Sequence, residues 1–213
     1  MKGEIMPIGV AISGANPLIS LEKVASLGMS TCQMSVPPEK WWSKKRIELI
    51  RRIAEEKEIE ITSLICGFKG ESYRDISTIK RTVGLLNPAT RGKRVLKVFS
   101  YSEFGLELRI KVIQAHIGFI PEDTSDPDYR GLVLASQKIA DHCKDGKRPE
   151  RKGELGKEYP LGEGDVDIEK FIDKLRKIGY AGHLTIEREI SGEKQIRDIL
   201  KAKELLQKLI NKE

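Results

Sequence analysis

The chain has 213 residues, of which 39% are hydrophobic and 33% charged, so it can bury one sizeable core and is too apolar for a disordered protein. Its 38 basic residues alternate with 32 acidic ones along most of its length, and the net charge of +6 therefore does not by itself indicate a nucleic-acid-binding protein. The apolar runs are too short to cross a membrane and the first residues lack a signal-peptide core, which predicts a cytoplasmic protein.

Three cysteines, Cys32, Cys66 and Cys143, are widely spaced along the chain. An odd number of cysteines at such spacing fits neither a disulfide framework nor a zinc knuckle. We therefore expect reduced thiols that are buried in the core.

The first third of the chain alternates short apolar segments with amphipathic ones. Strands are expected over residues 6–12, 31–36 and 59–66, and helices over residues 18–27 and 44–57. Ser43 stands at the N-cap of the second helix. A repeated β-then-α order with short turns predicts a parallel sheet with its helices packed outside.

The middle of the chain is less regular. Residues 72–86 are expected to form a long loop with a short helix, on the side of the sheet where substrate contacts tend to lie. A helix is expected over residues 88–104, a fourth strand over 109–117 and a further helix over 128–141. The fourth strand brings His116 near its carboxyl end.

The β-then-α order breaks after the fourth strand. Before the next expected strand, at residues 183–186, lie helical runs at 132–141 and 168–178 and a basic loop at 144–157. A long amphipathic helix over residues 193–211 ends the chain. These patterns predict five strands in a single α/β domain over residues 1–213.

The stretch at residues 179–189 places three charged residues at the end of a strand. A glycine stops the preceding helix, a β-branched and apolar segment follows, and the segment ends on Glu187, Arg188 and Glu189. Parallel α/β sheets present carboxylates at the carboxyl ends of their strands, so Glu187 is the residue on which a site would be built. The alternative is that the three charges only mark the exit of the strand into solvent.

Imidazoles and carboxylates at a common rim would form the ligand set of a divalent cation. His116, Glu187 and Glu189 are expected at strand ends, with His142 and Asp145 in a nearby loop. These residues do not form one motif of fixed spacing, and a single histidine at a strand end is more often structural. The basic loop would meet phosphate or another anion, or would only keep the protein soluble.

Four segments of the chain carry a family resemblance. They are Gln-Ala-His-Ile-Gly-Phe at 114–119 with Pro-Glu-Asp after it, His-Cys-Lys-Asp-Gly-Lys at 142–147, Leu-Gly-Glu-Gly-Asp-Val-Asp at 161–167, and Gly-Tyr-Ala-Gly-His-Leu-Thr-Ile-Glu-Arg-Glu-Ile at 179–190. In this order, and together with the βα opening, they resemble the xylose isomerase-like TIM-barrel family. That family groups sugar and sugar-phosphate isomerases and epimerases with endonuclease IV.

The resemblance implies a barrel of the TIM type that holds a divalent metal ion at its carboxyl rim: manganese, magnesium, cobalt or zinc. In such enzymes the metal polarises a carbonyl and a hydroxyl of a sugar while a carboxylate moves a proton between adjacent carbons. Carried over by position, Glu187 is the catalytic carboxylate and the metal ligand of the last strand. His142 is the ligand of the seventh strand, and His116 matches a histidine of the fourth. Lys144, Asp145 and Arg188 match positions near the substrate.

The chain departs from the family at its fifth and sixth strands. The patterns Glu-Thr-Gly-Gln and Asp-Pro-Ala-Asn, which carry the carboxylate ligands of those strands, do not occur in this sequence. The helix ending at Asp141 runs into His-Cys-Lys-Asp, as if a segment had been deleted near residues 141–143. The expected fold is thus an incomplete α/β barrel of five to six parallel strands with outer helices.

The loss of these strands has two expected consequences. Open strand edges favour pairing with another chain, in a homo-oligomer, unless a rearranged smaller sheet closes the gap. With two carboxylates gone, a metal ion would be held weakly by His116, His142 and Glu187, and turnover would be reduced or absent.

Three functions agree with these patterns to different degrees. The first is a metal-dependent isomerase or epimerase of a sugar or sugar phosphate, with impaired activity, and the second is a non-catalytic remnant of the barrel. The third, an abasic-site nuclease, fits worst, because Gly156 and Glu158 stand where the nuclease has metal-binding Asp and His residues.

Overall fold

The computed structural model describes residues 6–143, 159–164 and 166–212, and gives only the backbone of residues 140–143. The chain divides into two compact units. Unit 1 comprises Met1–Thr62 and Lys157–Glu213, and unit 2 comprises Ser63–Gly156. The single domain expected over residues 1–213 stays a prediction.

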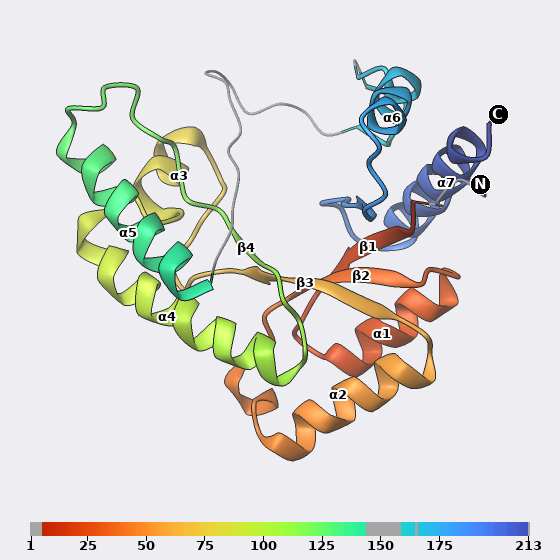
Figure 1. Ribbon diagram of the computed structural model, residues 1–213, viewed down its shortest axis with the longest axis horizontal. Coiled ribbons are helices and arrows are strands. Elements are labelled where there is room, and N and C mark those ends of the chain that lie inside the picture. The colour runs from red at the N-terminus through yellow and green to blue at the C-terminus, as the bar shows by residue number, and fades with distance from the viewer. Residues whose placement is uncertain (1–5, 144–158, 165, 213) are drawn as a thin grey trace. The chain divides into compact units, whose positions relative to one another are not determined.

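Unit 1 consists of parallel strands covered by helices. Its elements are β1 (Ile8–Ile12), α1 (Pro17–Ser26), β2 (Thr31–Ser35), a 3-10 helix (Glu39–Trp41), α2 (Lys44–Glu56), the start of β3 (Glu60–Cys66), α6 (Ile168–Lys177), β5 (Leu184–Ile186) and α7 (Glu193–Ile210). Strand β1 pairs in parallel with β2 on one side and with β5 on the other. Helix α1 packs on α2 and on the strands, and α7 packs on β1 and β5 (Figure 1).

The register of these strands sorts their side chains onto two faces. Val10 lies opposite Cys32 and Ile186, and all three are buried. The neighbouring row runs through Gly9, which lies opposite Thr31 and Thr185 and whose missing Cβ would come within 2.2 Å of the Thr31 hydroxyl. One face is therefore apolar and the other small and polar, as alternation along a strand requires.

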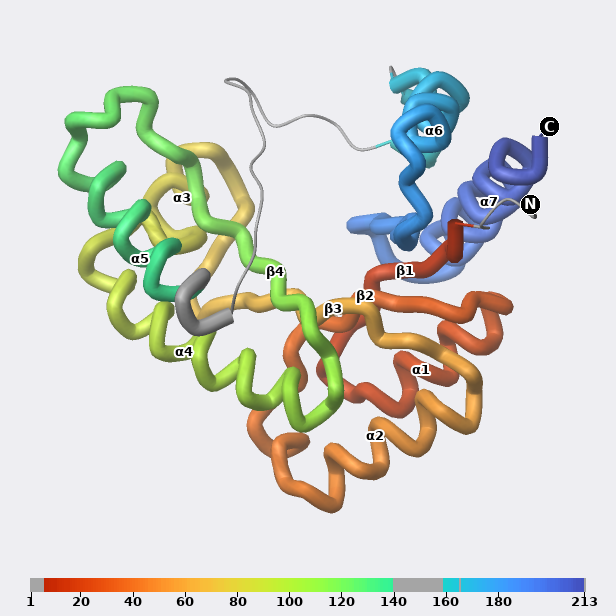
Figure 2. Tube along the Cα trace, viewed as in Figure 1, coloured from red at the N-terminus to blue at the C-terminus, as the bar shows by residue number. Residues whose placement is uncertain are grey.

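Unit 2 contains the remainder of β3 and the elements that follow it. These are α3 (Ile76–Thr82), α4 (Pro88–Glu107), β4 (Ile113–Ala115) and α5 (Pro127–Cys143). Strand β4 pairs with β3 in parallel, with Leu64 opposite Ile113 and Cys66 opposite Ala115. The long helices α4 and α5 pack against each other, as the green tubes of Figure 2 show.

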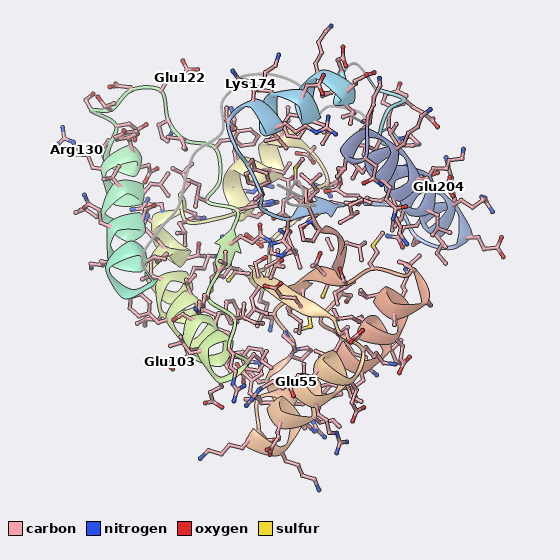
Figure 3. The ribbon with its side chains drawn as sticks, turned by 45° about the vertical axis from the view of Figure 1, so that its right-hand side comes forward. Glu55, Glu103, Glu122, Arg130, Lys174 and Glu204 are labelled. Carbon is pink, nitrogen blue, oxygen red and sulfur yellow. The ribbon has the colours of Figure 1, made fainter. Side chains whose placement is uncertain are left out.

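Local sequence signals explain where the helices begin and how they face solvent. Side chains at four N-caps accept a hydrogen bond from a first-turn amide: Asn16, Asp75, Asn87 and Asp167. Ser43 also occupies an N-cap, as expected, but its side chain makes no capping hydrogen bond. Charged side chains on the outer faces, such as Glu55, Glu103 and Glu204, point away from the helices they belong to (Figure 3).

The predicted fold class is confirmed. The described residues form a five-stranded sheet in the order β4-β3-β2-β1-β5, an incomplete α/β barrel of the TIM type. The fourth strand is shorter than residues 109–117, because Arg109 has a positive φ of 62° and the amide of Ile110 bonds to the carbonyl of Gly105, so both residues belong to the end of α4.

The prediction of buried, reduced thiols is met for the two cysteines whose side chains the structure describes. Cys32 and Cys66 are free and buried, and burial raises the pKa of the Cys32 thiol to about 12. The side chain of Cys143 lies outside the described residues. Among the described helices, none combines the length and the apolar character that crossing a membrane requires.

Candidate active site

Glu187 follows directly on β5 and is exposed. Strand β5 pairs with β1 through Gly9 opposite Thr185 and Val10 opposite Ile186, so a further step along this register places Ala11 beside Glu187. Ala11 in turn lies opposite Gln33 of β2. Continued one residue beyond the paired positions, this register would set Glu187 in the row of Ala11 and Gln33, on the small, polar face.

A buried ion pair fixes the backbone that carries Glu187. The Nε of Arg188 donates to the Asp198 carboxylate at 2.9 Å, and the two side chains are only 7% and 8% exposed. The side-chain amide of Gln195 donates to the backbone carbonyl of Arg188 at 2.9 Å. Both contacts come from the first turns of α7, so this helix holds the exit of β5 in place. The role of Arg188 in substrate binding stays a prediction.

A pocket of about 620 Å³ opens beside the strand end. Helices α6 and α7 and strand β5 line it, with Phe171, Leu175, Leu206 and Ile186 supplying much of the wall and Glu187 a negative charge. Its size suits a small molecule. The pocket therefore lies mainly on the apolar face of β5, with Leu184 and Ile186, whereas Thr185 and Glu187 belong to the other row of the strand.

His116 follows β4 in unit 2 and has an aromatic partner. Its Nδ1 lies 2.8 Å from the hydroxyl of Tyr73, and the two rings meet edge to face with centroids 5.6 Å apart. When Nδ1 carries the proton and donates to the tyrosine, the lone pair of Nε2 is available to a proton or a ligand. Beside it, the Gln114 amide donates to the Ser63 hydroxyl at 2.9 Å.

The loop that carries Tyr73 is held by charged side chains. The Glu71 carboxylate accepts from the amides of Phe68 at 3.0 Å and Gly84 at 2.8 Å. Buried Arg94 donates to the carbonyls of Thr82 and Gly84. These bonds hold the two ends of the loop together. The backbone that carries Tyr73 is therefore held in place where its hydroxyl contacts His116.

The other predicted site residues are placed as follows. His142 lies in the last turn of α5, so of the two positions that the sequence leaves open, the end of a helix or the end of a strand, the structure has the helix end. Nothing is described of its side chain, and its ligand role stays a prediction. Lys144 and Asp145 lie outside the described residues.

The described residues do not gather the ligands that a metal ion needs. Within the part of the chain that the structure describes, no group of three or more His, Cys, Asp or Glu side chains could hold an ion. Glu187 belongs to unit 1 and His116 to unit 2. No catalytic step is therefore derived through a metal, and the divalent ion stays a prediction.

Manganese is expected to stabilise the protein only weakly, because one carboxylate holds such an ion poorly. An ion present at its dissociation constant contributes about 0.4 kcal/mol, or a rise in Tm of about 1–2 °C for a chain of this size. Thermal unfolding with 1 mM manganese and with a chelator measures the difference. A rise above about 5 °C would contradict the expectation and indicate a full ligand set.

Comparisons with known proteins point to one fold. No protein-family model matches the chain, and a search of curated proteins finds no match. Among solved structures, the xylose isomerase domain protein from Planctomyces limnophilus is 29% identical, with a TM-score of 0.86 over 96% of this chain and 97% of that one. The fold is xylose isomerase-like.

Two further structures share this xylose isomerase-like fold at lower identity. D-psicose 3-epimerase from Clostridium cellulolyticum, solved with D-tagatose, is 14% identical, with a TM-score of 0.66 over 96% of this chain and 99% of that one. The 3-keto-D-glucoside 4-epimerase from E. coli is 12% identical, with a TM-score of 0.65 over 95% and 99%. At these identities the similarity shows the fold alone.

Three residues of the candidate site were not found from the sequence. Tyr73 lies in the loop after the third strand, where substrate contacts were expected, but no spacing singled it out. Gln33 is recognised as a site residue only from the pairing of β2 with β1, which places it opposite Ala11. Asp198 could have been found from its spacing, because it stands four residues before buried Ala202 on the apolar face of α7. A carboxylate at such a position requires a partner.

Proposed function

We propose that this chain is a sugar isomerase/epimerase-like protein in which the Glu187 carboxylate moves a proton on the carbon next to a sugar carbonyl. The observation that carries the proposal is the position of Glu187, exposed at the carboxyl end of β5. The 29% identity to a xylose isomerase domain protein over nearly the whole chain supports it, as does the naming of other structural neighbours as sugar epimerases.

The reaction needs a base that reaches the carbon next to the sugar carbonyl. The proton affinity of that base must allow it to accept the carbon-bound proton. An exposed carboxylate takes the carbon-bound proton, the released electron pair forms a carbon–carbon double bond, and the carbonyl oxygen gains the negative charge of an ene-diolate. Return of the proton to the other carbon, with transfer of the hydroxyl proton between the two oxygens, gives an isomer, and delivery of a proton from water to the opposite face gives an epimer. Gln33, in the same row as Glu187, is placed to bind a sugar hydroxyl.

The proposed substrates are small sugars with a carbonyl group. Free ketoses fit the neighbours whose names include D-psicose, D-tagatose and L-ribulose. A sugar phosphate would draw on the basic residues at 144–157, and a cytoplasmic location would suit such a substrate. A divalent ion would assist by polarising the carbonyl.

A non-catalytic remnant is the second candidate. It is favoured by one observation: the residues that the structure describes contain no metal-ligand cluster. A remnant would keep the fold and its contacts with other chains and would show no proton transfer.

Hydrogen exchange into the substrate separates the two candidates. The protein is incubated with D-fructose, D-tagatose, D-psicose or L-ribulose in deuterated water, with and without manganese, and the sugars are examined by NMR. We expect deuterium to enter at the carbon next to the carbonyl, and only there, because that is the carbon whose proton an ene-diolate loses. No deuterium in any sugar under either condition would favour the remnant.

A further inference from the structure

Among the residues that the structure describes, the strand order β4-β3-β2-β1-β5 leaves β4 and β5 as edge strands. The amide of Leu184 donates to the carbonyl of Pro7, so Leu184 faces β1 and, by alternation, the N–H and C=O of Thr185 face away from it. The amide of Leu64 donates to the carbonyl of Val112, so Ile113 and Ala115 face away from β3. Exposed groups of this kind are a template for pairing with another strand.

The phase of these edge groups restricts the register in which the two edges fit to steps of two residues. In a parallel ladder the N–H and C=O of one residue bond to two residues of the neighbouring strand that are two positions apart. In the register with the greatest overlap of β4 and β5, Thr185 would bond to Ile113 and Ala115 and lie opposite Gln114. One residue pair further on in the same direction, Ile186 would lie opposite Ala115, and Glu187 opposite His116.

The two edges also match in the character of their faces. Leu184 and Ile186 share the face of buried Val10, and Ile113 and Ala115 lie opposite buried Leu64 and Cys66, so apolar side chains would join apolar side chains. On the other face Thr185 would join Gln114. A shift of one residue would place every side chain on the wrong face.

Hydrogen bonding and apolar surface favour the same pairing. At the carboxyl ends the pairing would set the His116 imidazole beside the Glu187 carboxylate, so that a ring N–H could donate a hydrogen bond to a carboxylate oxygen. Near β5, Phe171 and Tyr180 on the pocket wall are 51% and 40% exposed. Apolar surface beside an open strand edge is typical of a contact with another chain.

We propose that a second copy of this chain completes the site, through parallel pairing of the β4 edge of one chain with the β5 edge of its partner. His116 then lies beside Glu187 of the partner subunit. Because each chain has both edges, two copies joined at both junctions would make a closed dimer in which the described β4 and β5 edges are both paired. This arrangement supplies two shared sites.

The shared site deepens the proposed function and, in its chemistry, rests on it. Glu187 of the partner subunit takes the carbon-bound proton of the sugar while the protonated His116 imidazole gives its proton to the carbonyl oxygen, so the electron pair of the C–H bond becomes the double bond of a neutral ene-diol. The reverse transfers, at the other carbon or on the other face, restore both groups. Tyr73 holds the imidazole by its Nδ1.

The first test is the molar mass in solution, by light scattering after size exclusion. The chain of 24.0 kDa is expected to run at twice that mass. Thr185→Pro removes an N–H that faces the open edge and leaves the bonds to β1, so it is expected to give a folded monomer, whereas the matched control Thr185→Ala keeps the N–H and stays dimeric. Ile113→Pro, on the other edge, provides a second variant, and circular dichroism checks that each folds. A monomeric wild-type chain, or folded proline variants that remain dimeric, would overturn the pairing.

The second test mixes two inactive variants, His116→Ala and Glu187→Gln. In a mixed dimer one junction keeps both native residues and the other loses both, so random mixing restores about a quarter of the wild-type exchange rate. No recovery on mixing, from a wild type that exchanges, would overturn the shared site. If the wild type shows no exchange, the proposed function fails, while the molar masses still decide the pairing.

Discussion

Asp198→Ala is expected to lower the free energy of unfolding by about 3–5 kcal/mol, because it removes a buried carboxylate that pairs with the Arg188 guanidinium. Arg188 and Asp198 are 7% and 8% exposed and 2.9 Å apart, so water cannot replace the lost carboxylate. The measurement is equilibrium unfolding in urea. Because the pair holds the exit of β5, the variant is also expected to lose order around Glu187.

The same helix offers a matched control. Glu193 pairs with Arg197 at 3.5 Å, but its side chain is 92% exposed, so Glu193→Ala is expected to change the stability by less than about 0.5 kcal/mol. Replacing both partners of the buried pair, with Arg188→Met and Asp198→Leu, should recover most of the loss, since apolar side chains of similar volume need no counter-charge. Equal losses for Asp198→Ala and the double variant would show that packing, not charge, is responsible.

Glu187→Gln is expected to slow deuterium exchange into the substrate by about 10²–10⁴-fold, because the amide keeps the shape of the side chain and cannot accept the proton. The rate is measured by NMR with the sugar that the wild-type protein exchanges fastest. Glu187 is exposed, so the substitution should leave the stability within about 0.5 kcal/mol of wild type, which separates a lost base from a lost fold.

Glu189→Gln is the matched control for this prediction. Glu189 is exposed and lies two residues beyond Glu187, so its replacement removes the same charge from the same stretch of chain. We expect it to retain most of the exchange activity. Unchanged exchange in Glu187→Gln, or an equal loss in both variants, would remove Glu187 from the role of base.

Much of the fold could be predicted because each element carries its own signal. Alternation and β-branching indicated the strands at 31–36 and 59–66, and the structure places β2 and β3 there. Helical spacing indicated the run at 168–178, where α6 lies. The fourth strand was overestimated because the positive φ of Arg109 extends the end of α4 into a segment whose composition resembles a strand.

The sequence by itself determined the strands and helices, the parallel fold class and the position of Glu187 at a strand end, because these depend on the spacing of apolar residues along one chain. Only the tertiary structure decided which polar groups meet. The contacts of Arg188 with Asp198 and of Tyr73 with His116, and the row from Glu187 to Gln33, depend on strand register and helix packing between residues distant in sequence. Sequence spacing does not encode such contacts, since each arises where two separately formed elements pack.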